Sequence, residues 1–161
     1  LENQVRDMLI FARGELPLPD RLSPPVLFDA LRAAADAHVG DMAVRWQCDV
    51  RDGELMCNRD TLVGTVLNLI DNAIHHGPAG TQITVRVGAH WFEVEDDGPG
   101  IAPEHQAHVF ERFYRAAPSG LSGSGLGLAI VKEIASQHGA QVSVRSPVHG
   151  VRGTAIRLSW A

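Results

Sequence analysis

Segments of alternating apolar and polar residues occur in pairs between amphipathic helical segments, and this order restricts the fold more than any other feature of the sequence. Strands joined by short turns pair antiparallel, whereas strands separated one by one by helices build a parallel sheet. We therefore predict an α+β fold, a two-layer α/β sandwich in which a mixed, mostly antiparallel sheet packs on helices.

The helical segments place apolar residues three and four positions apart. One helix is expected after Ser23-Pro24-Pro25 and continues to about His38. The longest runs from about Asp60 to His76, and another covers about Leu126–Gln137. A short helix is expected near Glu104–Phe110, inside a stretch that is otherwise rich in Gly and Pro.

Strand-like alternation with a period of two residues marks the segments 44–50, 83–87, 92–95, 140–145 and 154–160. Asp52-Gly53 predicts a turn directly after the first of these, with a short return strand at Glu54–Cys57. The first two strands are therefore expected to form a hairpin.

Length, charge and cysteine usage limit the class of protein. The 161 residues suit about one domain of the usual ~100–200 residues. The formal net charge of −5 disfavours a nucleic-acid partner. No apolar run approaches the ~18–20 residues that span a membrane, so we expect no direct membrane contact. Two cysteines outside a Cys-x-x-Cys pair suit a reducing compartment, and we expect a cytoplasmic location.

The first polar segment with possible chemistry lies on the longest predicted helix. Asn68, Asn72 and the pair His75 and His76 share one stripe of it. Amide side chains offer donors and acceptors without burying a charge. Mg²⁺ prefers oxygen ligands and takes its remaining partners from water and substrate phosphates. The same pattern is equally compatible with an ordinary solvated helix face.

The second segment, Glu95-Asp96-Asp97-Gly98-Pro99-Gly100-Ile101, follows a predicted strand directly. A carboxylate at a strand end can accept a hydrogen bond from an exocyclic amine, and glycines allow a flat ring to approach the backbone. Asp-Gly and Pro-Gly are also common turn dipeptides. An acidic turn without any ligand is therefore the alternative.

The third segment, Gly123-Ser124-Gly125-Leu126-Gly127-Leu128, opens the predicted helix at Leu126. Glycines before a helix N-terminus expose backbone N–H groups to an anion, and the helix dipole adds to the attraction. The pattern satisfies neither the dinucleotide-binding fingerprint nor the Walker loop. By itself it is a weak signal for a phosphate site.

Together, in this order and spacing, the three segments resemble the N, G1 and G2 boxes of bacterial sensor histidine kinases. The segment Phe110-Glu111-Arg112-Phe113-Tyr114-Arg115 resembles their F box. The resemblance covers about residues 25–160. It implies the Bergerat (GHKL) ATP-binding fold, which type II topoisomerases, mismatch-repair ATPases and large chaperones share.

The resemblance also implies the roles of individual residues in binding ATP and Mg²⁺. Asn72 matches the Mg²⁺ ligand and Asn68 the second amide near the ion and phosphates, so these two are the expected catalytic residues. Asp96 matches the carboxylate that accepts from the adenine amino group. A mobile ATP lid is expected over about 102–124, anchored by Phe110 and Phe113, and Arg112, Arg115 and Lys132 are candidate phosphate contacts. The other expected nucleotide-binding residues are His75, His76, Gly98, Gly100, Ile101, Phe110, Gly123, Gly125, Leu126 and Gly127.

The implied activity is transfer of the ATP γ-phosphoryl group to a histidine, followed by relay to an aspartate of a response regulator. Residues 1–15 resemble the end of the dimerisation and phosphoacceptor helix, 16–24 a linker and 25–161 the catalytic domain. None of the eight His residues is followed by an acidic residue. We therefore expect the phosphoacceptor in another part of a longer, homodimeric parent protein, whose dimerisation domain and response regulator are the expected partners.

Three other functions remain open at this level. Proteins that share this fold include serine kinases of the anti-sigma type and ATP-driven clamps. Both groups often carry Glu at the position where this sequence has Asn68. An amide cannot take a proton from water or a hydroxyl as that carboxylate can. A degenerate module that only senses ATP is the third alternative. The subfamily is open too: residues 6–13 resemble kinases that signal to enhancer-binding activators, whereas the F box resembles that of membrane-receptor kinases.

Overall fold

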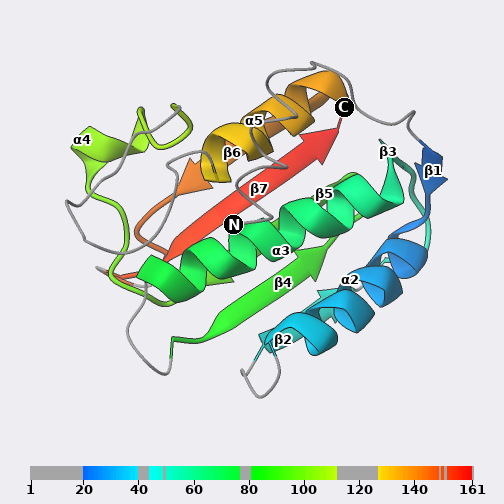
Figure 1. Cartoon of the computed structure of the whole chain (residues 1–161), viewed down its shortest axis with the longest axis horizontal. Coiled ribbons are helices and arrows are strands. Elements are labelled where there is room, and N and C mark those ends of the chain that lie inside the picture. The colour runs from blue at the N-terminus through cyan, green and yellow to red at the C-terminus, as the bar shows by residue number, and fades with distance from the viewer. Residues whose placement is uncertain are drawn as a thin grey trace.

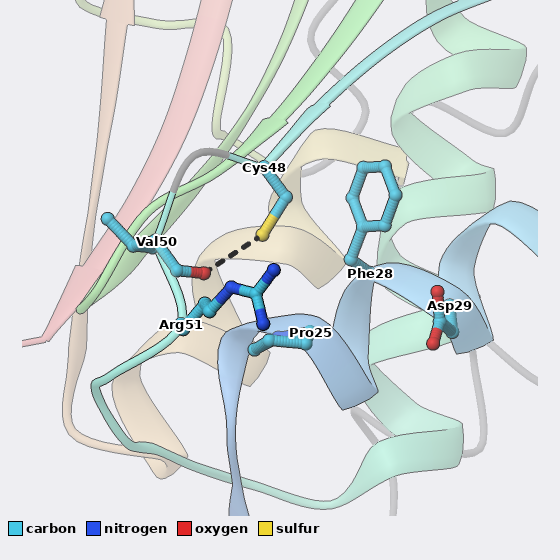
Figure 2. Close-up of a pocket in the computed structure, with 6 residues that line it drawn as sticks. All are labelled: Pro25, Phe28, Asp29, Cys48, Val50 and Arg51. Atoms are coloured by element: carbon cyan, nitrogen blue, oxygen red, sulfur yellow. Dashed lines mark hydrogen bonds between the residues drawn. The ribbon is translucent and has the colours of Figure 1, made fainter.

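The computed structural model describes residues 20–39, 44–48, 50–76, 81–111, 127–148, 150 and 152–160. Figure 1 shows two layers, with helices α2 (Pro24–Val39), α3 (Arg59–His76) and α5 (Gly127–Gln137) on one face of a five-stranded sheet. The predicted two-layer α+β architecture is therefore confirmed. None of the helices in these ranges is both long and apolar enough to cross a membrane.

The main sheet has the strand order β2-β4-β5-β7-β6. β2 and β4 are parallel, and the other three neighbouring pairs are antiparallel, as the sequence predicts for the sheet as a whole. β5 lies at the centre. The strands are β2 (Val44–Cys48), β4 (Ile83–Val87), β5 (Trp91–Asp96), β6 (Ala140–Arg145) and β7 (Thr154–Trp160).

The predicted hairpin between residues 44–50 and 54–57 is wrong. β3 (Leu55–Cys57) pairs instead with β1 (Asp20–Leu22) in a separate two-stranded antiparallel sheet. Gly53 has φ +137°, and a Cβ there would lie 2.5 Å from the carbonyl oxygen of Ala89. The chain is therefore pressed against the β4–β5 turn, and it leaves the main sheet before β3. β1 falls within the range 16–24 that the sequence suggests is a linker.

Helix α3 packs its apolar face on the middle of the sheet. Asn58 caps its start, because the Asn58 Oδ1 atom accepts hydrogen bonds from Thr61 N at 3.0 Å and Thr61 Oγ1 at 3.1 Å. Each fully buried aliphatic side chain contributes ~1.5–3 kcal/mol by leaving water. The buried side chains at this contact are Leu62, Val66, Leu69, Ile70 and Ala73 from α3 and Ile83, Val85, Phe92 and Val94 from the sheet.

The short helix expected over 104–110 is only one turn long, α4 (Pro103–Gln106). Beyond it the backbone hydrogen bonds His108 N to His105 O and Glu111 N to His108 O each span three residues. The segment therefore continues as tight turns and not as α-helix. These turns bury Val109 and bring Phe110 against the core.

Candidate functional site

The described parts of the predicted polar segments lie at one end of the molecule. Figure 1 shows that α3 ends and α5 begins on the side where α4 lies. β5 runs antiparallel to β4 and β7, so its acidic C-terminal end points to this side as well. The helix layer and the strand therefore bring the amide stripe, the acidic turn and the start of α5 to one end of the sheet.

On α3, the structure places Asn68 and Asn72 one turn apart, and both are half-buried. Their neighbours Leu69 and Ala73 are buried in the core, which fixes the rotation of the helix. The amides thus share one stripe as predicted. His75 and His76 are the last two residues of α3, and their side chains lie outside the described structure.

Asp96 is the last residue of β5 and is half-buried. Burial raises the pKa of its carboxyl above the ordinary value. A hydrogen bond of 2.9 Å from Gly98 N to Asp96 Oδ1 opposes this shift, and the negative charges of Asp97 and Glu95 add to it. A carboxylate whose charge is held in an unfavourable environment is a candidate for ligand recognition.

Asp97 has a different position from its neighbour. Its Oδ1 accepts a hydrogen bond of 2.7 Å from Gln82 N, and its own N–H donates to Gln82 O at 3.2 Å. These two bonds join the end of β5 to the start of β4. Asp97 therefore holds the turn in place, whereas the Asp96 carboxylate accepts its hydrogen bond from Gly98 N, two residues further along the chain.

The loop 98–101 is fixed against the turn between β6 and β7. Gly98 O accepts from Gly153 N at 2.8 Å, and Ile101 N donates to Ser146 Oγ at 2.8 Å. Gly100 has φ +85°, and a Cβ there would lie 3.0 Å from Ser146 Oγ. A glycine at this position is therefore required both by its backbone conformation and by the close approach.

Three residues near Asp96 are absent from the sequence-based site. Thr154 is buried and stands opposite Asp96 in the β5–β7 register. Ser146 Oγ lies 3.5 Å from Thr154 Oγ1, and Gln106 on α4 reaches the same turn. The only sequence signal for any of the three is the position of Thr154 at the start of the last predicted strand. Its pairing with Asp96 is a long-range contact.

Only part of the predicted lid and phosphate segment can be compared with the structure. Phe110 is half-buried and packs against the core, Gly127 is the first residue of α5, and Lys132 on that helix is exposed. Ile101 is half-buried at the start of the lid segment. Outside the described residues lie Arg112, Phe113, Arg115, Gly123, Gly125, Leu126 and the rest of 112–124.

The donor set at this end of the sheet limits what metal it can hold. Within the described ranges, no group of three or more His, Cys, Asp or Glu residues is placed to bind an ion. The amide oxygens of Asn68 and Asn72 suit Mg²⁺, which takes few protein ligands and completes its shell with phosphate and water oxygens. The residues therefore fit Mg²⁺ that arrives with a phosphorylated ligand, and do not form a cage for the ion alone.

Residues 57–161 match the model of the family described as histidine kinase-, DNA gyrase B-, and HSP90-like ATPase. The chain belongs to this family. The match to this ATPase family runs from β3 to the end of β7 and so contains the amide stripe, the acidic turn and the start of α5. It confirms the family that the sequence motifs indicate.

Two curated relatives narrow the comparison within the ATPase family. The chain is 54% identical over 124 residues to the sensor protein kinase FleS of Pseudomonas aeruginosa, covering 74% of this chain and 31% of that protein. It is 46% identical over 147 residues to the sensor protein QseC of Salmonella typhimurium, covering 91% of this chain and 31% of that protein. The chain thus spans about a third of the length of these relatives.

Solved structures of sensor kinases share the fold. The mycobacterial sensor histidine kinase MprB superposes with a TM-score of 0.71 at 31% identity, covering 86% of this chain and 95% of that one. Full-length ShkA in complex with AMPPNP gives a TM-score of 0.73 at 26% identity, covering 98% of this chain and 35% of that one. With FleS and QseC, these matches favour the histidine kinase assignment over an anti-sigma serine kinase.

Proposed function

We propose that this chain is the catalytic domain of a two-component sensor histidine kinase, which binds Mg-ATP and donates its γ-phosphoryl group to a histidine. The observation that carries the proposal is Asp96, a half-buried carboxylate with a raised pKa at the end of the central strand. Within the described residues no ion pair reaches it, although arginines meet the other buried carboxylates of the same strand.

Adenine suits the surroundings of Asp96. The carboxylate would accept a hydrogen bond from the exocyclic amino group, and the backbone from Gly98 to Gly100 would border the ring, with Ile101 beside it. A bond between a charged acceptor and a neutral donor contributes ~1.5–3 kcal/mol. Guanine presents an oxygen where adenine has its amine, so the same carboxylate would oppose guanine binding.

The phosphates would lie toward α3 and the start of α5. Asn68 and Asn72 would hold Mg²⁺, which when bound neutralises phosphate charge, with His75 and His76 near the phosphates and the base. Backbone N–H groups from Gly123 through Gly127 would receive the phosphates at the helix N-terminus. The segment 102–124 would serve as the lid, anchored at Phe110, whose packing on the core supports this role.

The chemistry of α3 suits a histidine acceptor. In the transfer a bond forms from an imidazole nitrogen to the γ-phosphorus while the bond to the ADP oxygen breaks. A neutral imidazole nitrogen attacks without first losing a proton, so the enzyme needs no carboxylate at position 68. Positioning and charge neutralisation then supply most of the rate.

The acceptor histidine and the receiving partner lie outside the residues that carry this site. No His in the chain precedes an acidic residue, so the acceptor would come from the dimerisation domain of the parent homodimer. The phosphoryl group would pass from there to an aspartate of a response regulator. Because both ATP and the response regulator would be met in the cytoplasm, the domain would act there.

Calorimetry with ATP and GTP tests the proposal on the 161-residue chain. ATP with Mg²⁺ should bind at least about tenfold more tightly than GTP, because the carboxylate distinguishes amine from oxygen. Incubation with γ-labelled ATP should leave the chain itself unlabelled, and labelling should appear on a separately added dimerisation domain of the parent. Equal affinities for ATP and GTP, or a stable acid-labile label on this chain alone, would contradict the proposal.

A further inference from the structure

We infer that Ser146 and Gln106 are positioning residues of the adenine site, which hold the loop 98–101 in the conformation that borders the base. The inference rests on the proposed nucleotide site and adds to it two residues outside the groups proposed to hold phosphate and metal. We call the two side chains, with the hydrogen bonds they make, the Ser146–Gln106 clamp.

The hydroxyl of Ser146 bridges the loop 98–101 and the turn between β6 and β7, beside the backbone hydrogen bond from Gly153 N to Gly98 O. It donates to Gly153 O at 2.7 Å and accepts from Ile101 N at 2.8 Å. Both its donor and its acceptor capacity are used. Removing the hydroxyl would leave a half-buried backbone N–H and a carbonyl without these partners, and such groups are costly to leave unpaired.

Gln106 makes the second half of the clamp from the other direction. Its Nε2 donates to Ile101 O at 2.9 Å and to Ser146 O at 2.9 Å. The peptide groups on both sides of Ile101 are therefore held by side chains, one from the β6–β7 turn and one from α4. This also fixes the first helix of the proposed lid to the turn between β6 and β7.

The clamp holds the Ile101 end of the loop 98–101, and the backbone N–H and carbonyl groups of Gly98 hold the other end. Gly98 N donates to Asp96 Oδ1 at 2.9 Å, and Gly98 O accepts from Gly153 N at 2.8 Å. Gly153 O is in turn the acceptor of Ser146 Oγ. Gly98 is thus held next to the recognition carboxylate by two hydrogen bonds in which Ser146 takes no direct part, whereas both hydrogen bonds of Ile101 belong to the clamp.

Because the clamp holds only the base side of the proposed site, its loss should have a recognisable effect on ligand affinities. Loosening Ile101 disturbs the surface on which the base lies and leaves the amides of α3 and the start of α5 unchanged. Variants of the clamp should therefore weaken adenosine, ADP and ATP by the same factor. A defect on the phosphate side would instead weaken ATP most and adenosine least.

The test uses Ser146→Ala and Gln106→Met in the 161-residue chain, with Ser143→Ala as the control. Ser143 lies on β6, the strand that ends just before Ser146, and is exposed. Calorimetry should show both clamp variants weakened about three- to tenfold for adenosine, ADP and Mg-ATP alike, and the control unchanged. In the full-length parent kinase the clamp variants should raise the KM for ATP with kcat unchanged, a split that a general loss of structure would not produce.

Two results would overturn the inference. One is affinity within about twofold of wild type in Gln106→Met and in a folded Ser146→Ala chain, as judged by circular dichroism. The other is a larger loss for ATP than for adenosine. Failure of the wild-type chain to bind any of the three ligands would instead overturn the proposed function, so the two failures are distinguishable. If Ser146→Ala does not fold, Gln106→Met on the one-turn helix α4 decides the matter alone.

Discussion

The central strand β5 carries two buried carboxylates on one face and a half-buried carboxylate on the other, and their surroundings differ. Strand alternation puts Glu93 and Glu95 on the face opposite Phe92 and Val94, which pack in the core, yet only 3% and 6% of the glutamate surfaces are exposed. Asp96 continues the helix-facing row of Phe92 and Val94. The first pair and the third carboxylate are therefore separated by the sheet, although they are neighbours in sequence.

Arginines meet the first pair. Arg86 Nη1 lies 3.3 Å from Glu93 Oε1 and 3.1 Å from Glu95 Oε1. Arg157 Nε lies 3.0 Å from Glu93 Oε2 while its guanidinium stacks 3.8 Å from the Trp91 ring centre. Arg145 is 3.8 Å from each glutamate. These side chains cover the carboxylates and compensate their charge.

Asp96 has no such compensation among the described residues, and burial raises its pKa. A buried carboxylate that the protein pairs is part of the structure, whereas one left with a single backbone donor is unfavourable until a ligand arrives. The comparison therefore separates the carboxylates that stabilise the fold from the one that we propose binds the base. Substitutions on the two faces should affect different measurements.

The largest effect on binding is expected for Asp96→Asn. It should weaken ATP about ten- to a hundredfold, because the charge-assisted bond to the adenine amine is lost. The free energy of unfolding should stay equal or rise, since a neutral amide is easier to bury. Calorimetry and urea unfolding measure the two quantities. Asp97→Asn is the matched control, because it keeps the Oδ1 acceptor of Gln82 N; a larger binding loss there would reverse the assignment of the two residues.

Arg86→Met is expected to lower stability and leave nucleotide binding unchanged. Removing this arginine leaves Glu93 and Glu95 with weaker compensation and should lower the free energy of unfolding by about 1–2 kcal/mol, after allowance for the partial exposure of Arg86. Nucleotide affinity of the folded chain should not change. Arg45→Met on the edge strand β2 serves as the control, since Arg45 is exposed. Equal destabilisation by both variants would show that the pairing with the glutamates contributes nothing.

The smallest effect concerns pH. Because the pKa of Asp96 is raised, its carboxylate becomes protonated at a higher pH than an exposed Asp does. The affinity for adenosine should fall as the pH falls through this raised pKa, and Asp96→Asn should remove the dependence. In the nucleotide-free chain the sign is opposite for stability: the contribution of Asp96 is largest at low pH and is lost as pH rises through the raised pKa. Affinity that is flat with pH in the wild type would contradict the role of the ionised carboxylate.

Local patterns predict most of the elements. The predicted bounds of the strands at 83–87, 140–145 and 154–160 agree with β4, β6 and β7, and the helix predicted from Asp60 begins one residue earlier. These elements follow from periodicities within one segment. The pairing of β3 with β1 does not, because it joins residues 33 to 37 positions apart, such as Leu22 with Leu55 and Asp20 with Cys57.

The residues of the candidate site also fall into a group that local sequence patterns predict and a group that they do not. Asp96 and the asparagines of α3 stand within recognisable local motifs, so the sequence points to them directly. Ser146, Gln106 and Thr154 join the site through long-range contacts, and an isolated Ser before Pro147 has no pattern of its own. The sequence does not predict the burial of Glu93 and Glu95 either. Strict alternation places them on a solvated face and does not reveal the arginines that cover it.

The position of β7 has a consequence for how the domain is synthesised. β7 lies between β5 and β6 in the sheet, and its first residue, Thr154, pairs with Asp96 of β5. A nascent chain that has emerged only through β6 can form the pair β4–β5, but β5 and β6 have no shared partner to join them. Folding of the site therefore has to wait until residues 154–160 leave the ribosome, and a ribosome-bound chain halted before them should neither bind ATP nor resist proteolysis.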